Sequence, residues 1–427
     1  MKKRIAALPL VSLARCGGGG LETAGSVAAP GPTNGASEPH SFVEPTQTKT
    51  YKGIGAAHSL SYRLTDEYSY DKKDVLINGT PTKVRDDTTR FLDRQGKGSE
   101  LYVSDIGSVR NSGVEVTYDP KNAIYTLKVN QGGIANEIRM QDPAHHTDFD
   151  GLVGPQAGVP NLEKPIPGDD KWRERGVQYY EVSQGTDDKY DVSTFFVELP
   201  GTSTKYVTYA GYVRNMMTKG VETTLTDDDS GTTTRAFSDN IFERAAFTFG
   251  ELTPTSAVPK TGSASYSGAM IASSVVNPTF DGPTQLQSYF QWMSGTATVS
   301  VDFGANSVTA NLAGTTHEAF PTGRFVLPPS GGQANQIPIQ TTVPTGATFN
   351  ASGTATIDLV GTGGFTGGFN KAGFTWAGGK VDVDIIGSSL AGAFYGPKGE
   401  EVGGAFRIVG GVPDQRVDVL GAFTGKK

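Results

Sequence analysis

The chain has almost no cysteine, since Cys16 is the only one among 427 residues. One thiol cannot form an intramolecular disulfide, so the folded part must be stabilised by its core and its hydrogen bonds. Cys16 also lies in a leader-like segment near the N-terminus, where it offers no nucleophile to a folded active site. A disulfide-stapled scaffold and a cysteine-dependent enzyme are therefore both excluded.

Histidines and catalytic motifs are scarce as well. The chain has 5 histidines, and it contains neither a His-Glu-x-x-His zinc motif nor a Gly-x-x-x-x-Gly-Lys-Ser/Thr phosphate loop. None of the histidines lies in a nucleophile-elbow context. We predict that the protein is not an enzyme, with no catalytic residue and no bound metal; a metal hydrolase that uses His145 and His146 is the alternative.

Charge is sparse and slightly negative. Charged residues make up 19% of the chain, and the formal net charge at pH 7 is −7. Nucleic-acid-binding proteins carry a basic face that neutralises phosphates, so we predict no nucleic-acid partner. After the leader, no run of 18 apolar residues occurs, which leaves no candidate transmembrane helix.

Residues 1–16 have the pattern of a bacterial lipoprotein signal peptide. Three cations at Lys2, Lys3 and Arg4 precede a short apolar segment, and residues 13–16 resemble a lipobox that ends at Cys16. Arg15 departs from the small residue that is usual there, so a weak signal peptide with an incidental thiol is the alternative. We predict that Cys16 is lipidated, with palmitate among its acyl chains, and that this lipid is the only membrane attachment.

Residues 17–49 are rich in glycine, alanine, proline, serine and glutamate and show almost no periodicity. Such a segment buries too little apolar surface to offset the entropy lost on ordering. We predict a disordered tether that begins with the four glycines 17–20 and holds the folded part away from the membrane.

The rest of the chain predicts an all-β fold. It contains 56 glycines and 24 prolines in all, and each interior glycine costs a helix about 1 kcal/mol relative to alanine. Short strands joined by turns accommodate this composition. Alternating residues at 114–118 and 124–129 flank a turn-like Asp-Pro-Lys-Asn segment and predict a hairpin. We predict a domain of antiparallel strands over residues 50–245.

From residue 246 to the C-terminus the strand pattern is denser. Segments 262–268, 295–301 and 353–359 share an opening of small residues, and turns are expected at 304–307 and 387–389. Roughly eight strands result, enough to close an up-and-down barrel. Aspartates alternate with the apolar residues, so one face meets water, unlike the apolar outer band of an outer-membrane barrel. We predict a soluble eight-stranded β-barrel over residues 246–427.

One segment near the C-terminus is the most specific. Phe394-Tyr395-Gly396-Pro397 is followed by Glu401-Val402-Gly403-Gly404, and we name residues 394–404 the signature segment. It resembles the closing signature of the transferrin-binding-protein-B-like (TbpB-like) surface lipoproteins of Gram-negative bacteria. Residues 261–268 resemble the first barrel strand of that family, and residues 204–212 resemble the end of its "handle" sheet. The signature occurs once, so the chain resembles a single-lobed member.

The resemblance implies a handle domain, a barrel and a solute-binding role at the outer-membrane surface. The implied ligand is a host or environmental protein, or haem, within iron or haem acquisition, with possible delivery to a TonB-dependent transporter. No cofactor is implied beyond haem as the bound solute. The alternative is a structural or protective surface lipoprotein that binds a host regulator such as complement factor H and has no transport role.

Five residues of the first half are candidates for ligand binding. His145 and His146 are adjacent imidazoles that suit a haem or metal ligand; the alternative is a solvated polar loop. Trp172, Tyr179 and Tyr180 lie near two arginines, and these residue types dominate binding hot spots. The alternative for the two tyrosines is a half-buried place in a strand.

Two further segments have weaker signals. Met216 and Met217 suit either an exposed adaptable contact or core packing. Residues 227–231 resemble a calcium loop only faintly, because the alternating ligands and the closing glutamate are missing. We predict a charged hairpin tip there.

Overall fold

The computed structural model describes residues 47–103, 113–121, 124–132, 134–141, 152–153, 177–186, 189–198, 203–227, 231–278, 289–321, 343–412 and 415–427. Within these ranges the regular elements are β-strands, apart from one short 3-10 turn, η2 (Thr255–Ala257). The all-β prediction is confirmed. In the same ranges, no helix has the length and apolarity that crossing a membrane requires. The predicted signal peptide, Cys16 and nearly all of the tether lie outside them, and the limits proposed for the domains stay predictions.

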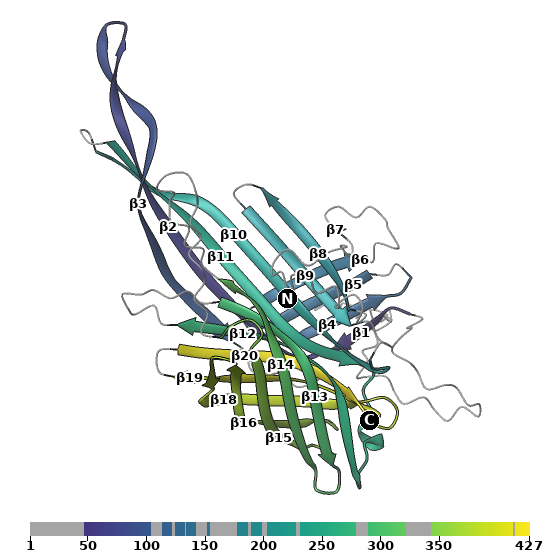
Figure 1. The fold of residues 1–427 in the computed structure, drawn as a ribbon. Coiled ribbons are helices and arrows are strands. Elements are labelled where there is room, and N and C mark those ends of the chain that lie inside the picture. Colours follow the sequence, from purple (N-terminus) through teal and green to yellow (C-terminus); the bar gives the residue numbers. More distant parts are fainter. Residues whose placement is uncertain are drawn as a thin grey trace, which may run out of the picture.

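The strands form three antiparallel sheets (Figure 1). The small sheet has the order β1 (Lys49–Lys52), β4 (Val114–Asp119), β5 (Ile124–Gln131) and β6 (Ile134–Gln141). The long sheet has the order β3 (Thr80–Val103), β2 (Ile54–Ile77), β11 (Gly231–Gly250), β10 (Val207–Asp227), β9 (Lys189–Glu198), β8 (Val177–Thr186) and β7 (Leu152–Val153). We call these two sheets together the handle. The β4–β5 pairing, with Val114 opposite Val129, confirms the predicted hairpin.

The third sheet closes into the barrel. Its order is β15 (Thr348–Ile357), β14 (Ser307–Pro321), β13 (Tyr289–Asp302), β12 (Ser263–Pro278), β20 (Gln415–Lys426), β19 (Glu401–Val412), β18 (Ile385–Tyr395), β16 (Phe365–Trp376) and β17 (Gly379–Asp382). Pairing of β15 with β16 completes the ring, and the short β17 pairs with β16 alone. The ring itself therefore has eight strands, as predicted.

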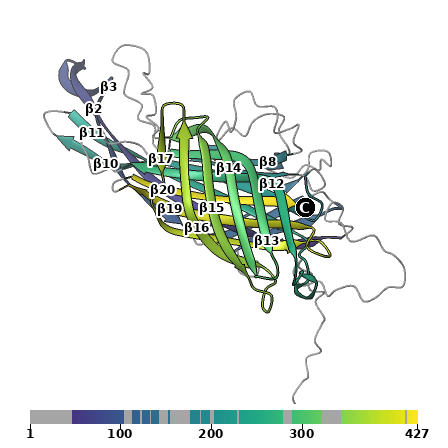
Figure 2. The same cartoon turned by 60° about the horizontal axis from the view of Figure 1, so that its bottom comes forward.

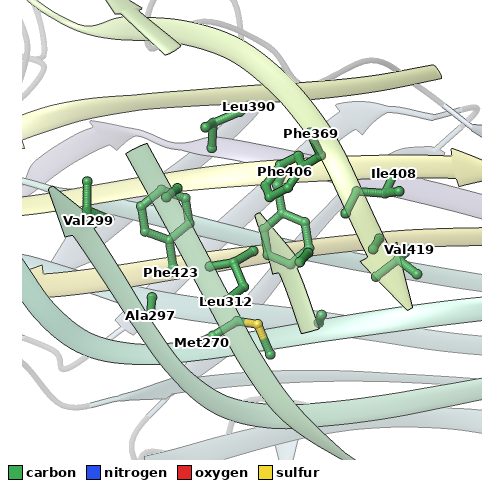
Figure 3. Close-up of a cluster of buried hydrophobic side chains, with 14 of the residues drawn as sticks. Met270, Ala297, Val299, Leu312, Phe369, Leu390, Phe406, Ile408, Val419 and Phe423 are labelled. Carbon is green, nitrogen blue, oxygen red and sulfur yellow. The ribbon is translucent and has the colours of Figure 1, made fainter. Parts of the chain in front are cut away.

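The barrel interior is filled by side chains that alternate along each strand. On β13, Ala297, Val299 and Val301 are buried while the residues between them are exposed. Figure 3 shows Phe369, Phe406 and Phe423 among the aliphatic side chains of this core. An eight-stranded barrel is just wide enough for side chains to fill, so the alternation dictates a packed scaffold.

One predicted turn is wrong. Residues 387–389 were expected to form a turn, but Gly387 lies inside β18, where Gly387, Ser388 and Ser389 pair with Val409, Ile408 and Arg407. The register shifts between Ile385 and Gly387. The glycine marks an irregularity within one strand rather than a reversal of the chain, a second role that glycine commonly has in sheets. The turn predicted at 304–307 is confirmed between β13 and β14.

The long sheet lies between the small sheet and the barrel. Tyr212 and Phe247 belong to a core cluster that includes Val116 and Leu127 of the small sheet. Their neighbours on the opposite face of the long sheet, including Tyr209 and Ala246, pack with Ile271, Trp292 and Leu420 of the barrel. Side chains alternate across a strand, so the two faces of the long sheet pack into two different cores. The long sheet thereby holds the small sheet and the barrel in one three-layer structure.

The long sheet extends well beyond the barrel. Figures 1 and 2 show the ribbon formed by β2 and β3 passing the edge of the barrel in both views. Pairing of β11 with β2 reaches Thr232 opposite Tyr70, whereas β2 and β3 remain paired as far as Ile77 opposite Thr80. The last part of this hairpin is therefore two strands wide.

Candidate functional site

The structure leaves most of the predicted site residues untested. Cys16, His145, His146 and Trp172 lie outside the described residues. Tyr179 and Tyr180 are placed on β8, opposite Phe196 and Phe195 of β9, and their side chains are not among those described. Ligand binding by His145, His146, Trp172, Tyr179 and Tyr180 stays a prediction, and so does lipidation of Cys16.

The two weaker segments can be placed. Met216 and Met217 lie on β10 and are both partly buried, and Arg214 Nη2 donates to Met216 Sδ at 4.0 Å. Asp227 pairs with Gly231 at the end of the β10–β11 hairpin, which confirms the predicted hairpin tip. Within the described ranges, no cluster of three or more His, Cys, Asp or Glu side chains is suited to hold a metal ion.

The signature segment forms the contact between barrel and handle. The buried carboxylate of Glu401 accepts hydrogen bonds from the backbone N–H groups of Lys205, Tyr206 and Val207, at 2.6, 2.7 and 3.1 Å. Burial raises the pKa of Glu401, and these three donors oppose the rise. One barrel side chain thereby binds the handle backbone at the first residue of β10 and the two residues before it.

The connection from handle to barrel is bound by the same segment. The N–H of Gly396 donates to the carbonyl of Glu251 at 2.9 Å, and the Thr253 hydroxyl donates to the carbonyl of Gly396 at 2.6 Å. Leu252 also makes a single β-bridge to Tyr395. The chain leaving β11 is therefore hydrogen-bonded to the barrel before η2 and β12 begin.

Two glycines of the signature segment make this approach possible. Gly396 has a φ of +85°, and a Cβ there would lie 2.6 Å from Cδ2 of Tyr206. A Cβ on Gly403 would lie 2.7 Å from Cγ2 of Val207. Glycine at these two positions therefore leaves room for the side chains of Tyr206 and Val207, where β10 begins.

A polar cluster is buried where β2 and β11 face the barrel. Arg244 Nη1 donates to Asn215 Oδ1 and to the carbonyl of Glu243, both at 2.8 Å. The Arg244 guanidinium carbon lies 4.5 Å from the ring centre of Phe290, within the range of a cation–π contact. The cation is thus held by neutral oxygens and an aromatic ring of the barrel strand β13.

His58 lies beside Arg244 and is fully buried. Its Nε2 is 3.4 Å from the hydroxyl of Ser273 on β12. Burial, and then the charges of Arg244 and Arg407, hold the pKa of His58 well below its ordinary value. The imidazole is therefore neutral at neutral pH.

The barrel side of the cluster holds one buried carboxylate. Arg416 Nη2 donates to Asp418 Oδ2 at 3.1 Å, and Arg407 Nε lies 3.6 Å from Asp418 Oδ1. Burial raises the pKa of Asp418, and the two arginines oppose the rise. Sequence reasoning missed this cluster, because His58, Arg244 and Asp418 are far apart in the chain and each resembles an ordinary strand residue.

A second network joins the two sheets of the handle. Arg214 binds Asp191 through two hydrogen bonds of 2.8 Å, and its Nη1 lies 3.6 Å from Glu243 Oε1. The hydroxyl of Tyr212 donates to Glu243 Oε2 at 2.8 Å and accepts from Asn136 of β6 at 2.7 Å. Both networks lie inside interfaces between packed sheets, which is typical of structural contacts.

The tip of the β2–β3 hairpin is different, because its side chains face solvent. Residues 76–82 are all exposed, and Leu76 and Ile77 keep 71% and 48% of their surface accessible. Asn78 and Gly79 have φ values of +53° and +81°. Asn-Gly with two positive φ angles is typical of a type I′ turn, which fixes the register of a hairpin.

Residues 258–427, the whole of the barrel, match the protein family described as the C-lobe and N-lobe beta barrels of Tf-binding protein B. The resemblance that the signature segment indicated is confirmed for this part of the chain. No curated protein matches.

Solved structures of the same kind are similar to the chain at low identity. One is the Tyr-167-Ala and Trp-176-Ala double mutant of transferrin binding protein B from Haemophilus parasuis Hp5, which is 13% identical to this chain. The match covers 90% of this chain and 78% of that chain, with a TM-score of 0.25. Another is intact Ap-TbpB with its N and C lobes, with 12% identity, 91% and 86% covered, and a TM-score of 0.26. Scores this low do not support a residue-by-residue correspondence.

Proposed function

Because residues 258–427 form a barrel of the Tf-binding protein B kind, we propose that the protein is a lipoprotein of a Gram-negative cell surface that captures a protein ligand without catalysing a reaction. The proteins named with that barrel bind transferrin, so an iron- or haem-carrying host protein is the ligand class. Lipid on Cys16 anchors the chain in the outer membrane. A TonB-dependent transporter receives the iron or haem after capture.

The observation that carries this proposal is that the barrel and the handle differ in what their structures suit them for. The barrel matches the family and has a core of packed side chains, which suits a scaffold. The handle is fastened to it by Glu401 and by the buried Arg244 cluster, so it is presented in one orientation. Ligand specificity then belongs to the handle, since function is grafted on a scaffold through its outlying segments.

The test is a binding measurement with purified full-length protein against transferrin, haemoglobin and complement factor H. The proposal predicts saturable binding of transferrin or haemoglobin. Binding of factor H alone would favour the protective role instead, and binding of none of the three would contradict capture of a host protein. Incorporation of labelled palmitate by the wild type, and its loss in Cys16→Ser, tests the anchor separately.

A further inference from the structure

One side chain on the barrel-facing side of β2 is polar, while its neighbours on that side are apolar. Ile54, Ala56 and Leu60 are buried, and each belongs to a core cluster that includes barrel residues. His58 lies between them in the same alternation and is 0% exposed. A buried imidazole loses its hydrogen bonds to water, so an apolar residue would pack at this position at a lower cost. Packing alone therefore does not account for His58.

The surroundings of His58 suit a neutral ring. Nε2 lies 3.4 Å from Oγ of Ser273 on β12, and Nδ1 is buried with no hydrogen-bond partner among the described residues. The ring of Phe290 on β13 is 5.4 Å away between ring centres, and β3 places Val103 opposite His58 in the ladder. A protonated imidazole donates from both nitrogens, so the charged form would leave the Nδ1–H donor buried and unsatisfied.

The charges that act on His58 repel a further proton. Arg244 of β11 lies opposite His58 in the ladder, and Arg407 of β19 belongs to the barrel. Burial first, and then these two charges, lower the pKa of His58. On β20, the buried carboxylate of Asp418 is held by Arg407 and Arg416. Protonated His58 would therefore be a buried cation beside two others, at the contact between two domains.

This contact is hydrogen-bonded to the backbone at one end. Glu401 holds the handle backbone of residues 205–207, and the chain leaving β11 is hydrogen-bonded to the barrel there as well. Arg244 precedes Gly250 by six residues in β11, and Arg407 follows Glu401 by six residues in β19. At about 3.3 Å per residue, the cluster around His58 lies roughly 20 Å along both layers from the Glu401 contact.

At the other end the two layers pack through apolar side chains. Leu60 and Phe242 of the handle form a small cluster with Val275 and Phe290 of the barrel. The backbone of His58 is paired with strands on both sides, β11 and β3. Water therefore reaches the imidazole more readily by separation of the two layers at this end than by fraying of the long sheet.

We propose that protonation of His58 separates the handle from the barrel at the Leu60–Phe290 end of their contact, with the Glu401 contact as the hinge. The contact is closed at neutral pH and opens reversibly in mild acid, which rotates the handle relative to the barrel. Opening takes up one proton, so each pH unit below about 6.5 shifts the equilibrium up to tenfold toward the open form. The proposal goes beyond ligand capture and does not depend on which ligand is bound.

The carboxyl group of Asp418 acts in the opposite direction. Burial raises its pKa in the closed form, so acid favours the closed form through this group. Glu401 keeps its three donors in both forms and adds no pH dependence to the opening. Asp418 also titrates in a His58→Gln variant, and the difference between that variant and wild type therefore reports the imidazole.

The test measures distances between spin labels in the full-length chain from pH 7.5 to pH 5.5. Cys16→Ser removes the single native thiol, and labels at Val221→Cys on β10 and Ile386→Cys on β18 then report on the two layers. Both native side chains are exposed, by 63% and 78%. We expect a population at longer distance that grows up to tenfold per pH unit as pH falls and disappears when pH is restored.

The matched label pair is Val360→Cys with Ile386→Cys, because both positions are exposed and lie in the barrel. Its distance should stay constant over the same pH range. His58→Gln and His58→Leu each remove the titrating group, and with either of them the Val221–Ile386 distance should keep its neutral-pH value in acid. Thermal unfolding at pH 7.5 shows which variants keep the fold.

Three results would overturn the proposal. One is a Val221–Ile386 distance that does not change between pH 7.5 and pH 5.5. Another is an equal change in folded His58→Gln or His58→Leu protein, which would place the trigger on another group. The third is a parallel change in the Val360–Ile386 pair, which would mean that the barrel itself unfolds.

Discussion

Glu401 is a single barrel side chain that binds the backbone of the handle. Its carboxylate accepts three backbone hydrogen bonds from residues 205–207, and it is itself part of the signature segment. Removing this carboxylate would leave three backbone N–H groups without an acceptor, so the junction depends on it.

Glu401→Gln is expected to lower the free energy of unfolding by about 1–3 kcal/mol, because a neutral amide accepts through a single oxygen and brings an N–H₂ group toward three donors. The adjacent Glu400→Gln is the control. The Glu400 carboxylate accepts an exposed bond from the N–H of Lys398, so its substitution should cost less than about 0.5 kcal/mol. Denaturant unfolding of both variants measures the difference, and equal stabilities would contradict the role given to Glu401.

His58 predicts a pH dependence of stability. Its pKa is lowered in the folded protein by burial and by Arg244 and Arg407, so the unfolded chain binds more protons at mildly acidic pH. The stabilising contribution is fully present above the unfolded pKa, near 6.5, and decreases by up to about 1.4 kcal/mol per pH unit below it.

The comparison of wild type with His58→Gln between pH 5 and pH 7.5 isolates this effect. Carboxyls with raised pKa, such as Glu401 and Asp418, titrate in both proteins and cancel in the difference. As pH falls, the free energy of unfolding should decrease more for wild type than for His58→Gln. A His58→Gln slope equal to that of wild type would refute the assignment.

At the scale of elements, the signature hairpin shows what its glycines do. The two strands β18 and β19 pair from Tyr395 opposite Glu401 onward, and Gly403 faces the start of β10 in the handle. An alanine there would press on the fully buried Val207 and on Tyr395. The hairpin therefore needs glycine for contact with another domain as well as for its own turn.

Gly403→Ala is expected to destabilise the protein by about 1–3 kcal/mol, the usual cost of overpacking a closed interface. Gly387→Ala in the same hairpin is the control, because a Cβ there meets no atom within 4 Å. Its stability should stay within about 0.5 kcal/mol of wild type. Melting temperatures of the two variants test the contrast, and similar losses in both would argue against a contact-specific role.

Alternation in the sequence predicted the elements that have one buried face. The β4–β5 hairpin and the barrel strands show it clearly, as at Ala297, Val299 and Val301. The long strands β2 and β3 were not predicted, because beyond the core a ribbon needs no apolar face and leaves no period-two signal. The buried polar cluster at the junction could not be predicted either, since Arg244 reaches Phe290 and His58 reaches Ser273 only through tertiary packing.

At the scale of the molecule, three layers are arranged around one sheet. The long sheet packs on the small sheet through Tyr212 and Phe247 and on the barrel through Tyr209 and Ala246. Phe196 of the handle and Trp292 of the barrel meet edge to face, 5.3 Å between ring centres. A ligand bound at the far end of the handle is therefore held at a fixed distance from the barrel.

The sequence indicated the barrel and its family more completely than the site. A short signature identified the barrel because the packing there allows few residues, whereas a binding surface on projecting strands follows no periodic rule. Candidate residues such as His145 and Trp172 were selected by residue type alone, which says what a side chain can do and not where it lies.

Hydrogen–deuterium exchange of the full-length protein, with and without saturating transferrin, tests the central claim most directly. Ligand contact with the handle predicts slower exchange in handle strands β1–β11, with barrel strands β12–β20 unchanged. Protection confined to the barrel, with the handle exchanging as in the free protein, would contradict the account.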